Sequence, residues 1–132
     1  MASIETLIST GGEPFHSNRT AMLELLERVR VCERRAVAAS EASRPRFKKR
    51  GQLLPQERVA LLLDPGSPFL ALCTLAGLGL DNADLDKSVP GGGVICGIGF
   101  VSNLRCMISA SDSGIDAGAL QPMGIDKQLR IQ

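Results

Sequence analysis

The sequence has little from which a strongly charged or strongly aromatic surface could be built. It contains no Trp, no Tyr and four Phe, and its 15 basic and 14 acidic residues leave a net charge of only +1. A nearly neutral chain has no overall field that attracts nucleic acid or an anionic membrane, so we expect neither as a partner. No apolar stretch approaches the roughly 20 residues that span a bilayer, and no secretory signal pattern is present. We therefore expect a soluble intracellular protein.

Residues that carry catalysis or bind metals are also scarce. The single histidine, His16, lies far in sequence from any candidate nucleophile, which argues against a Ser/His/Asp or Cys/His arrangement. The four cysteines form no C-x-x-C pair and stand among apolar neighbours, so we expect buried or half-buried free thiols rather than a zinc site or disulfides. They are Cys32, Cys73, Cys96 and Cys106. Nothing in the pattern pairs Asp112 with Asp116, and we assign no catalytic residue and no metal ligand.

The first half of the chain predicts helices. Between residues 17 and 40, apolar residues recur at three- and four-residue spacing, which indicates an amphipathic helix that packs against a core or another subunit. A basic run containing Phe47 follows at residues 44–50. It is typical of a solvated helix end, with contacts to phosphate or a base as the alternative. A short helix then starts at Pro55 and ends before the turn at Asp64.

The second half predicts a small sheet. The candidate strands are residues 69–75, 94–101 and 104–109. The last two form a hairpin across Ser102 and Asn103, and their almost wholly apolar sequences predict a sheet covered on both faces. The helices predicted for this chain are too few to cover both faces of such a sheet, and the chain stops within a predicted helix that begins near Gln121. We therefore expect the front part of a larger domain.

Glycine-rich segments surround the hairpin, and residues 77–93 are predicted to form a loop. A dinucleotide-binding turn needs G-x-G-x-x-G ahead of a helix, whereas Gly97 and Gly99 fall within a strand, where glycine more often marks a bulge or a close backbone approach. The loop at residues 111–121 is better placed, because Pro122 can start a helix whose first free N–H groups could accept an anion. The alternative is a plain connection whose glycines adopt a positive φ.

Two motifs carry a family resemblance. Residues 53–69, LLPQERVALLLDPGSPF, follow the pattern L-L-x-x-E-R-[IV]-x-x-L-L-D-P-G-S-x-F, and residues 93–106, GVICGIGFVSNLRC, follow a glycine-punctuated strand pair. From about residue 15 to its end, the chain resembles the carboxyltransferase (beta) subunit of biotin-dependent acyl-CoA carboxylases, such as propionyl-, methylcrotonyl- and geranyl-CoA carboxylases. It departs from that family at Asn103, which replaces a turn glycine, and at residues 116–122, whose form is more similar to the geranyl-CoA branch.

The resemblance implies an α/β chain that is an incomplete N-terminal part of a crotonase-like spiral of ββα units. The expected divisions are a flexible N-terminus at residues 1–16, a helical lead-in at 17–52, and the truncated start of the carboxyltransferase N-terminal domain at 53–132. The implied reaction moves a carboxyl group from carboxybiotin to an acyl-CoA through an enolate, which an oxyanion hole of backbone N–H groups stabilises. In the family those donors lie beyond this chain, so the isolated chain is expected to be inactive.

By the same resemblance, the loop at residues 111–121 helps to hold CoA. The expected CoA-binding residues are Ser111, Gly114, Ala117, Gly118, Ala119 and Lys127. The implied partners are the acyl-CoA substrate, an alpha subunit that carries biotin, and further full-length beta subunits, in the bacterial cytoplasm or the mitochondrial matrix. Two alternatives stay open: a non-catalytic interaction module that docks through the helix at residues 17–40, and a free-standing nucleotide-binding domain.

Overall fold

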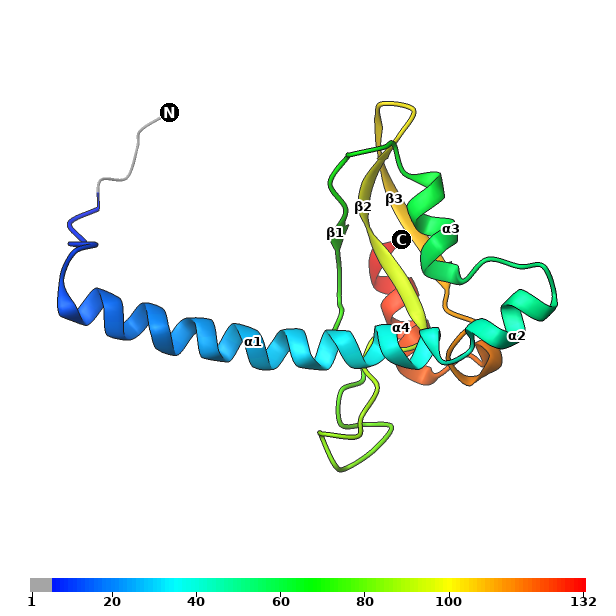
Figure 1. The fold of residues 1–132 in the computed structure, drawn as a ribbon, viewed down its shortest axis with the longest axis horizontal. Coiled ribbons are helices and arrows are strands. Elements are labelled where there is room, and N and C mark those ends of the chain that lie inside the picture. Colours follow the sequence, from blue (N-terminus) through cyan, green and yellow to red (C-terminus); the bar gives the residue numbers. More distant parts are fainter. Residues whose placement is uncertain (1–5) are drawn as a thin grey trace. The chain divides into compact units, whose positions relative to one another are not determined.

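The computed structural model describes residues 6–132 and divides into two compact units within its first helix, between Val31 and Cys32. Residues 1–5 of the predicted flexible N-terminal segment lie outside the described residues. The second unit contains all the strands of the described residues and all the expected CoA-binding residues (Figure 1). No helix within residues 6–132 has both the length and the apolar character needed to span a bilayer.

The predicted amphipathic helix is α1, Glu13–Glu41, which begins four residues earlier than the sequence pattern indicated. Glu13 lies in its first turn, where a negative charge interacts favourably with the helix dipole. Pro14 follows it, and proline is tolerated at the start of a helix because its missing N–H has no helical partner there. In the first unit most of the apolar residues of α1 are exposed, including Met22 at 57% and Leu25 at 52%, and Phe15 is half-buried.

Three short helices follow, and proline marks the first turn of each. They are α2, Arg44–Lys49; α3, Pro55–Leu62; and α4, Pro122–Ile131. The bounds of α3 and α4 agree with the sequence predictions. The basic run is a helix, as expected, and the ring of Phe47 is buried within the second unit. A buried ring is not available to stack on a base, so that part of the alternative interpretation is wrong, whereas contact of the exposed Lys48, Lys49 and Arg50 with phosphate stays a prediction.

The sheet contains β1, Leu70–Ala71; β2, Val94–Val101; and β3, Leu104–Ser111, in that order and antiparallel. The predicted hairpin of β2 and β3 is confirmed. Its two turn residues, Ser102 and Asn103, have φ values of 51° and 63°, as a type I′ turn requires. The carboxylate of Asp64 accepts both of their backbone N–H groups at 2.7 Å.

The predicted strand at residues 69–75 is reduced to the two residues of β1. They pair with Ile98 and Gly97 of β2. The extended conformation stops at Cys73, which has a φ of 51°, and a tight turn follows. The apolar run was therefore a correct signal for proximity to the sheet but an incorrect one for the length of the strand.

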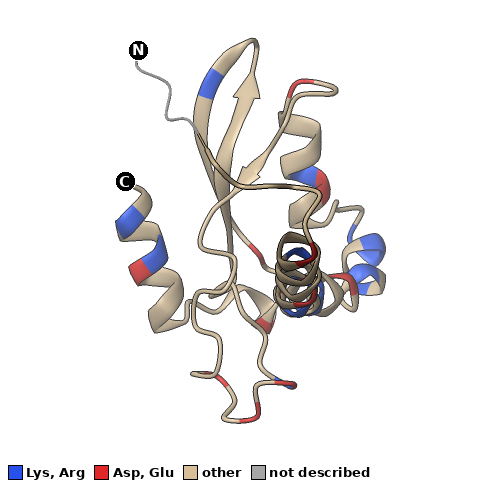
Figure 2. Ribbon diagram, turned by 90° about the vertical axis from the view of Figure 1, so that its left-hand side faces the viewer, with Lys and Arg blue, Asp and Glu red and all other residues tan. Residues whose placement is uncertain are grey.

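Each face of the sheet is covered by a different helix. Leu63, directly after α3, and Phe69 lie against Gly99 on one face, while Gly124 of α4 lies against Val94 on the other (Figure 2). The helices are roughly 12 to 15 Å long, whereas an eight-residue strand extends over roughly 27 Å. Parts of both faces are consequently open, and Leu104 and Met107 of β3 are 69% and 48% exposed. The helices of this chain therefore cover the sheet only in part, as the sequence analysis expected.

Candidate functional site

The loop at residues 111–121 is attached to the end of α1 and the start of α2. The Ser43 hydroxyl donates to the Gly114 carbonyl at 2.6 Å, and the Arg46 guanidinium donates to the Ser113 carbonyl at 2.8 Å. Charged donors make the stronger kind of hydrogen bond, so Arg46 is an effective anchor. These contacts join residues about 70 positions apart in the sequence and fix the backbone of the loop.

A buried carboxylate organises the first part of the loop. Asp112 accepts the Ser40 hydroxyl at 2.7 Å and the Gly114 N–H at 3.1 Å, while its own N–H donates to the Gly93 carbonyl at 2.8 Å. A Cβ at Gly114 would lie 2.9 Å from the Ser40 Cα, closer than carbon atoms pack. Gly114 is therefore needed for a close approach to α1. Asp112 and Asp116 do not form a carboxylate pair, because Asp116 accepts the Gln121 amide instead.

The second part of the loop presents its backbone to solvent. The short 3₁₀ turn η1, Asp116–Gly118, has Ala117 at a φ of 54° and Gly118 at 86°. Ser111, Ala117 and Ala119 are exposed, whereas Gly114 is buried. The expected CoA-binding residues thus separate into an exposed set around η1 and a buried support. The positive φ interpretation is correct for Gly118.

The start of α4 offers fewer free donors than its sequence suggested. Pro122 has no N–H, and the N–H groups of Gly124 and Ile125 both donate to the Gln121 carbonyl, at 2.9 and 3.2 Å. An anion site needs several first-turn N–H groups that point outward. A phosphate cradle at this helix start therefore has little geometric support. The N–H groups of Gly118 and Ala119 at η1 are used in the same way, donating to the Ile115 and Asp116 carbonyls at 2.9 and 3.0 Å, so η1 presents an exposed surface of small residues and not a set of free donors.

Lys127 points into the interior, although the sequence analysis placed it with the CoA-binding residues. It is 5% exposed, and its ammonium donates to the Val94 carbonyl at 2.6 Å and to the Gly91 carbonyl at 3.1 Å. Burial lowers the pKa of Lys127, and its interactions with the Cys96 thiol oppose that lowering. The ammonium is held beside β2 and not on the exposed side of the loop.

A largely apolar cavity of about 500 Å³ lies between the C-terminal part of α1, α3, β1 and β2. Its apolar wall includes Val59, Leu63, Phe69 and Leu72. Lys127 and Cys96 also line it, and Lys127 is the only Lys or Arg among the lining residues that the structure describes. The volume falls in the range of small-molecule sites, roughly 300 to 1,000 Å³.

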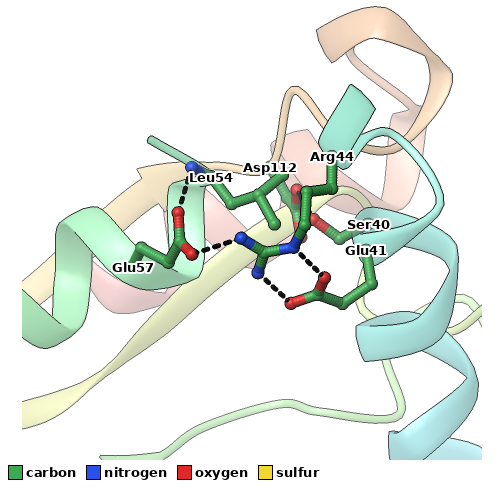
Figure 3. A network of polar contacts seen from close by, with 6 residues as sticks. All are labelled: Ser40, Glu41, Arg44, Leu54, Glu57 and Asp112. Carbon is green, nitrogen blue, oxygen red and sulfur yellow. Dashed lines mark hydrogen bonds and ion pairs between the residues drawn. The ribbon is translucent and has the colours of Figure 1, made fainter. Parts of the chain in front are cut away.

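A charged cluster connects α1, α2 and α3 (Figure 3). Arg44 makes hydrogen-bonded ion pairs with Glu41 at 2.7 Å and with Glu57 at 2.6 Å, and Glu57 also accepts the Leu54 N–H at 2.8 Å. Hydrogen bonds from Arg44 lower the pKa of both glutamates, and these pairs raise the pKa of Arg44. The cluster joins the two short helices to the end of α1, beside the anchor of the loop.

The strand glycines are sites of close approach. A Cβ at Gly97 would lie 2.5 Å from the nearest atom of the Phe69 ring and would collide with the Leu70 carbonyl, and one at Gly99 would lie 3.2 Å from the same ring. This confirms the structural explanation of the two glycines. The dinucleotide interpretation has no support, because both residues lie within β2 and face packed side chains.

The cysteines follow the prediction with one exception. All are free; Cys96 is buried, and Cys32 and Cys106 are half-buried. Cys73 is exposed, because the φ of 51° at this residue turns the chain out of the sheet. The expectation that every thiol is at least half-buried is wrong at that position. Within residues 6–132 no group of three or more His, Cys, Asp or Glu side chains is arranged to hold a metal ion.

Sequence reasoning missed the residues that hold the loop. Ser40, Ser43 and Arg46 lie in or next to helices, and the loop residues that they contact are about 70 positions away. The sequence offered one signal for these contacts, which was the presence of small polar residues at the end of a helix whose stripe is otherwise apolar. Such residues favour contacts with nearby backbone, but their distant partners in the fold are not encoded locally.

Comparison with known proteins gives consistent results. Residues 46–132 match the carboxyl transferase domain family. The chain is 48% identical over 97 residues to the beta1 subunit of the biotin-dependent 3-methylcrotonyl-coenzyme A carboxylase of Mycobacterium tuberculosis, covering 74% of this chain and 18% of that protein. It is 38% identical over 126 residues to the mitochondrial methylcrotonoyl-CoA carboxylase beta chain of Arabidopsis thaliana, covering 95% and 21%.

A solved structure matches as well. The beta subunit of P. aeruginosa geranyl-CoA carboxylase superposes with a TM-score of 0.85 and 45% identity, covering 98% of this chain and 24% of that one. This match confirms the expected crotonase-like α/β class. The chain spans about a fifth of the length of these relatives.

Proposed function

Because this chain belongs to the carboxyl transferase domain family, we propose that it forms part of the carboxyltransferase subunit of a biotin-dependent acyl-CoA carboxylase. The observation that carries this proposal is the similarity to the geranyl-CoA carboxylase beta subunit over 98% of the chain. In that role it contributes one wall of the acyl-CoA site. An alpha subunit carries the biotin, and further beta subunits complete the assembly, in the bacterial cytoplasm or the mitochondrial matrix.

The exposed surface around η1 is the proposed contact with CoA. Ser111, Ala117, Gly118 and Ala119 have small side chains that leave room for this ligand, while the N–H groups of Gly118 and Ala119 hold the shape of the loop. Gly114 is buried and allows the loop to lie close to Ser40 of α1. The residues fit a binding role and supply no general acid, base or nucleophile, so the 132-residue chain alone is expected to bind without catalysing transfer.

A chimera tests this function. The 132 residues replace the matching segment of the P. aeruginosa geranyl-CoA carboxylase beta subunit, and carboxylation of acyl-CoA is measured with its alpha subunit. We expect activity, and Ala119→Asp is expected to raise the KM for acyl-CoA about fivefold, since like charges about 4 Å apart repel by about 1 kcal/mol in water. Ala38→Asp, also at an exposed position, is the matched control. An assembled but inactive chimera, or equal KM values for the two variants, contradicts the proposal.

A docking module is the second candidate, favoured by the exposed apolar residues of α1. Met22, Leu25 and Leu26 are all exposed within the first unit. A module of this kind folds and acts without a catalytic remainder. Light scattering with size-exclusion chromatography distinguishes the two, because a module is a well-behaved monomer or dimer at all concentrations, whereas part of a larger enzyme with open sheet faces is expected to form larger soluble oligomers as its concentration rises.

A further inference from the structure

The buried ammonium of Lys127 has no counter-ion within the part of the chain that the structure describes. Its partners are the carbonyls of Gly91 and Val94 and the buried Cys96 thiol, and none of the ion pairs found in residues 6–132 includes it. Removing a charge from water without an opposite charge is costly. The arrangement therefore leaves a site where an anion would be bound favourably.

The acidic side chains that line the same cavity are already occupied. The Glu33 carboxylate accepts the Thr74 hydroxyl at 2.8 Å, and the Asp112 carboxylate accepts from Ser40 and Gly114. Neither pairs with Lys127. The groups around the ammonium, Gly91, Val94 and Cys96, all belong to the cavity wall. A ligand in this cavity therefore lies against the residues that surround the ammonium.

The rest of the wall selects for an apolar chain. Val59, Leu63, Phe69 and Leu72 contribute side chains without hydrogen-bonding groups, and a volume of about 500 Å³ admits a chain of several carbons. A ligand with a negative group at one end and an aliphatic chain at the other satisfies both features. Phosphate or another small anion would leave the apolar wall without a partner.

We propose that this cavity binds the carboxylate end of a medium-length aliphatic chain, with the carboxylate beside Lys127 and the chain along the wall formed by α3 and β1. The carboxylate could belong to a free carboxylic acid or to an acyl chain that has a second carboxylate at its far end. Both present the same chemistry to the site. The proposal does not depend on the carboxyl transferase function.

Calorimetric titration of the 132-residue chain with octanoate tests the proposal. Octanoate is expected to bind at least about tenfold more tightly than 1-octanol, since a hydrogen bond to a charged group contributes that much. Hexanoate has two methylenes fewer than octanoate, and each missing methylene is expected to weaken binding about fourfold. Competition with glutaryl-CoA tests the second source: displacement of octanoate points to a carboxylated acyl chain in the cavity, and no displacement points to a free acid, with any glutaryl-CoA binding then attributed to the surface around η1.

Variants locate the charge. Lys127→Met is expected to weaken octanoate binding at least about tenfold, Lys127→Arg to retain most of it, and Lys49→Met, at an exposed position of α2, to leave it unchanged. Equal binding of octanoate and 1-octanol, or no effect of Lys127→Met, would overturn the proposal and leave Lys127 as an anchor for α4. If Lys127→Met does not fold, the comparison of octanoate with 1-octanol in the unchanged chain decides the question.

Discussion

The contact between Gly92 and Gly124 attaches α4 to the beginning of β2, and it makes a quantitative prediction. Gly92 has a φ of 61°, and a Cβ there would lie 2.8 Å from the Gly124 nitrogen and 2.9 Å from its Cα. Gly92→Ala therefore combines a left-handed backbone penalty of about 1 to 2 kcal/mol with overpacking of about 1 to 3 kcal/mol. We expect a total loss of about 2 to 5 kcal/mol in the free energy of unfolding.

A matched control separates the two contributions. Gly66 has a φ of 76°, and no atom lies within 4 Å of the position that a Cβ would occupy, so Gly66→Ala tests the backbone penalty alone. Urea unfolding followed by far-ultraviolet circular dichroism gives both values, provided that the m-values agree. Gly92→Ala is expected to lose about 1 to 3 kcal/mol more than Gly66→Ala. Equal losses would refute the close approach of α4 to β2.

Two further predictions concern charge and thiol exposure. Because the pKa values of the two glutamates bound to Arg44 are lowered in the folded state, the unfolded chain binds more protons as the pH falls below their ordinary 4.5, and stability is lost there. Arg44→Gln should flatten this acid loss in urea titrations between about pH 6 and 3, and Arg50→Gln should not; identical curves contradict the cluster. Iodoacetamide should modify Cys73 rapidly and Cys96 only after unfolding, as peptide mass analysis would detect; early labelling of Cys96 contradicts its burial.

Local signals were sufficient for most of the secondary structure. Hydrophobic periodicity located α1, proline at the first turn located α3 and α4, and the Ser102-Asn103 pair located the hairpin. These features depend on residues within a few positions of one another, where steric preferences and capping act directly. The sequence pattern was therefore enough to predict the hairpin and the helices around it.

Non-local contacts explain what the sequence left undetermined. The apolar run at residues 69–75 pairs with β2 for only two residues, because Cys73 adopts a positive φ that its residue type does not favour. Lys127 was expected near a phosphate, but it contacts carbonyls 33 and 36 positions earlier. In both places the outcome depends on how distant segments meet, which periodicity and spacing do not report.

The structure also changes which part of the chain should be regarded as the unit that carries the loop. The family match begins at residue 46, whereas Ser40, Ser43 and Arg44, which hold the loop or join the short helices, come before it. Without Ser40, the buried Asp112 carboxylate would keep only the Gly114 N–H as a hydrogen-bond donor. A buried carboxylate that lacks hydrogen bonds lowers the stability of the fold. The compact unit beginning at Cys32 includes these residues. The end of α1 therefore helps to hold the proposed CoA-binding loop in place, although it lies outside the matched domain.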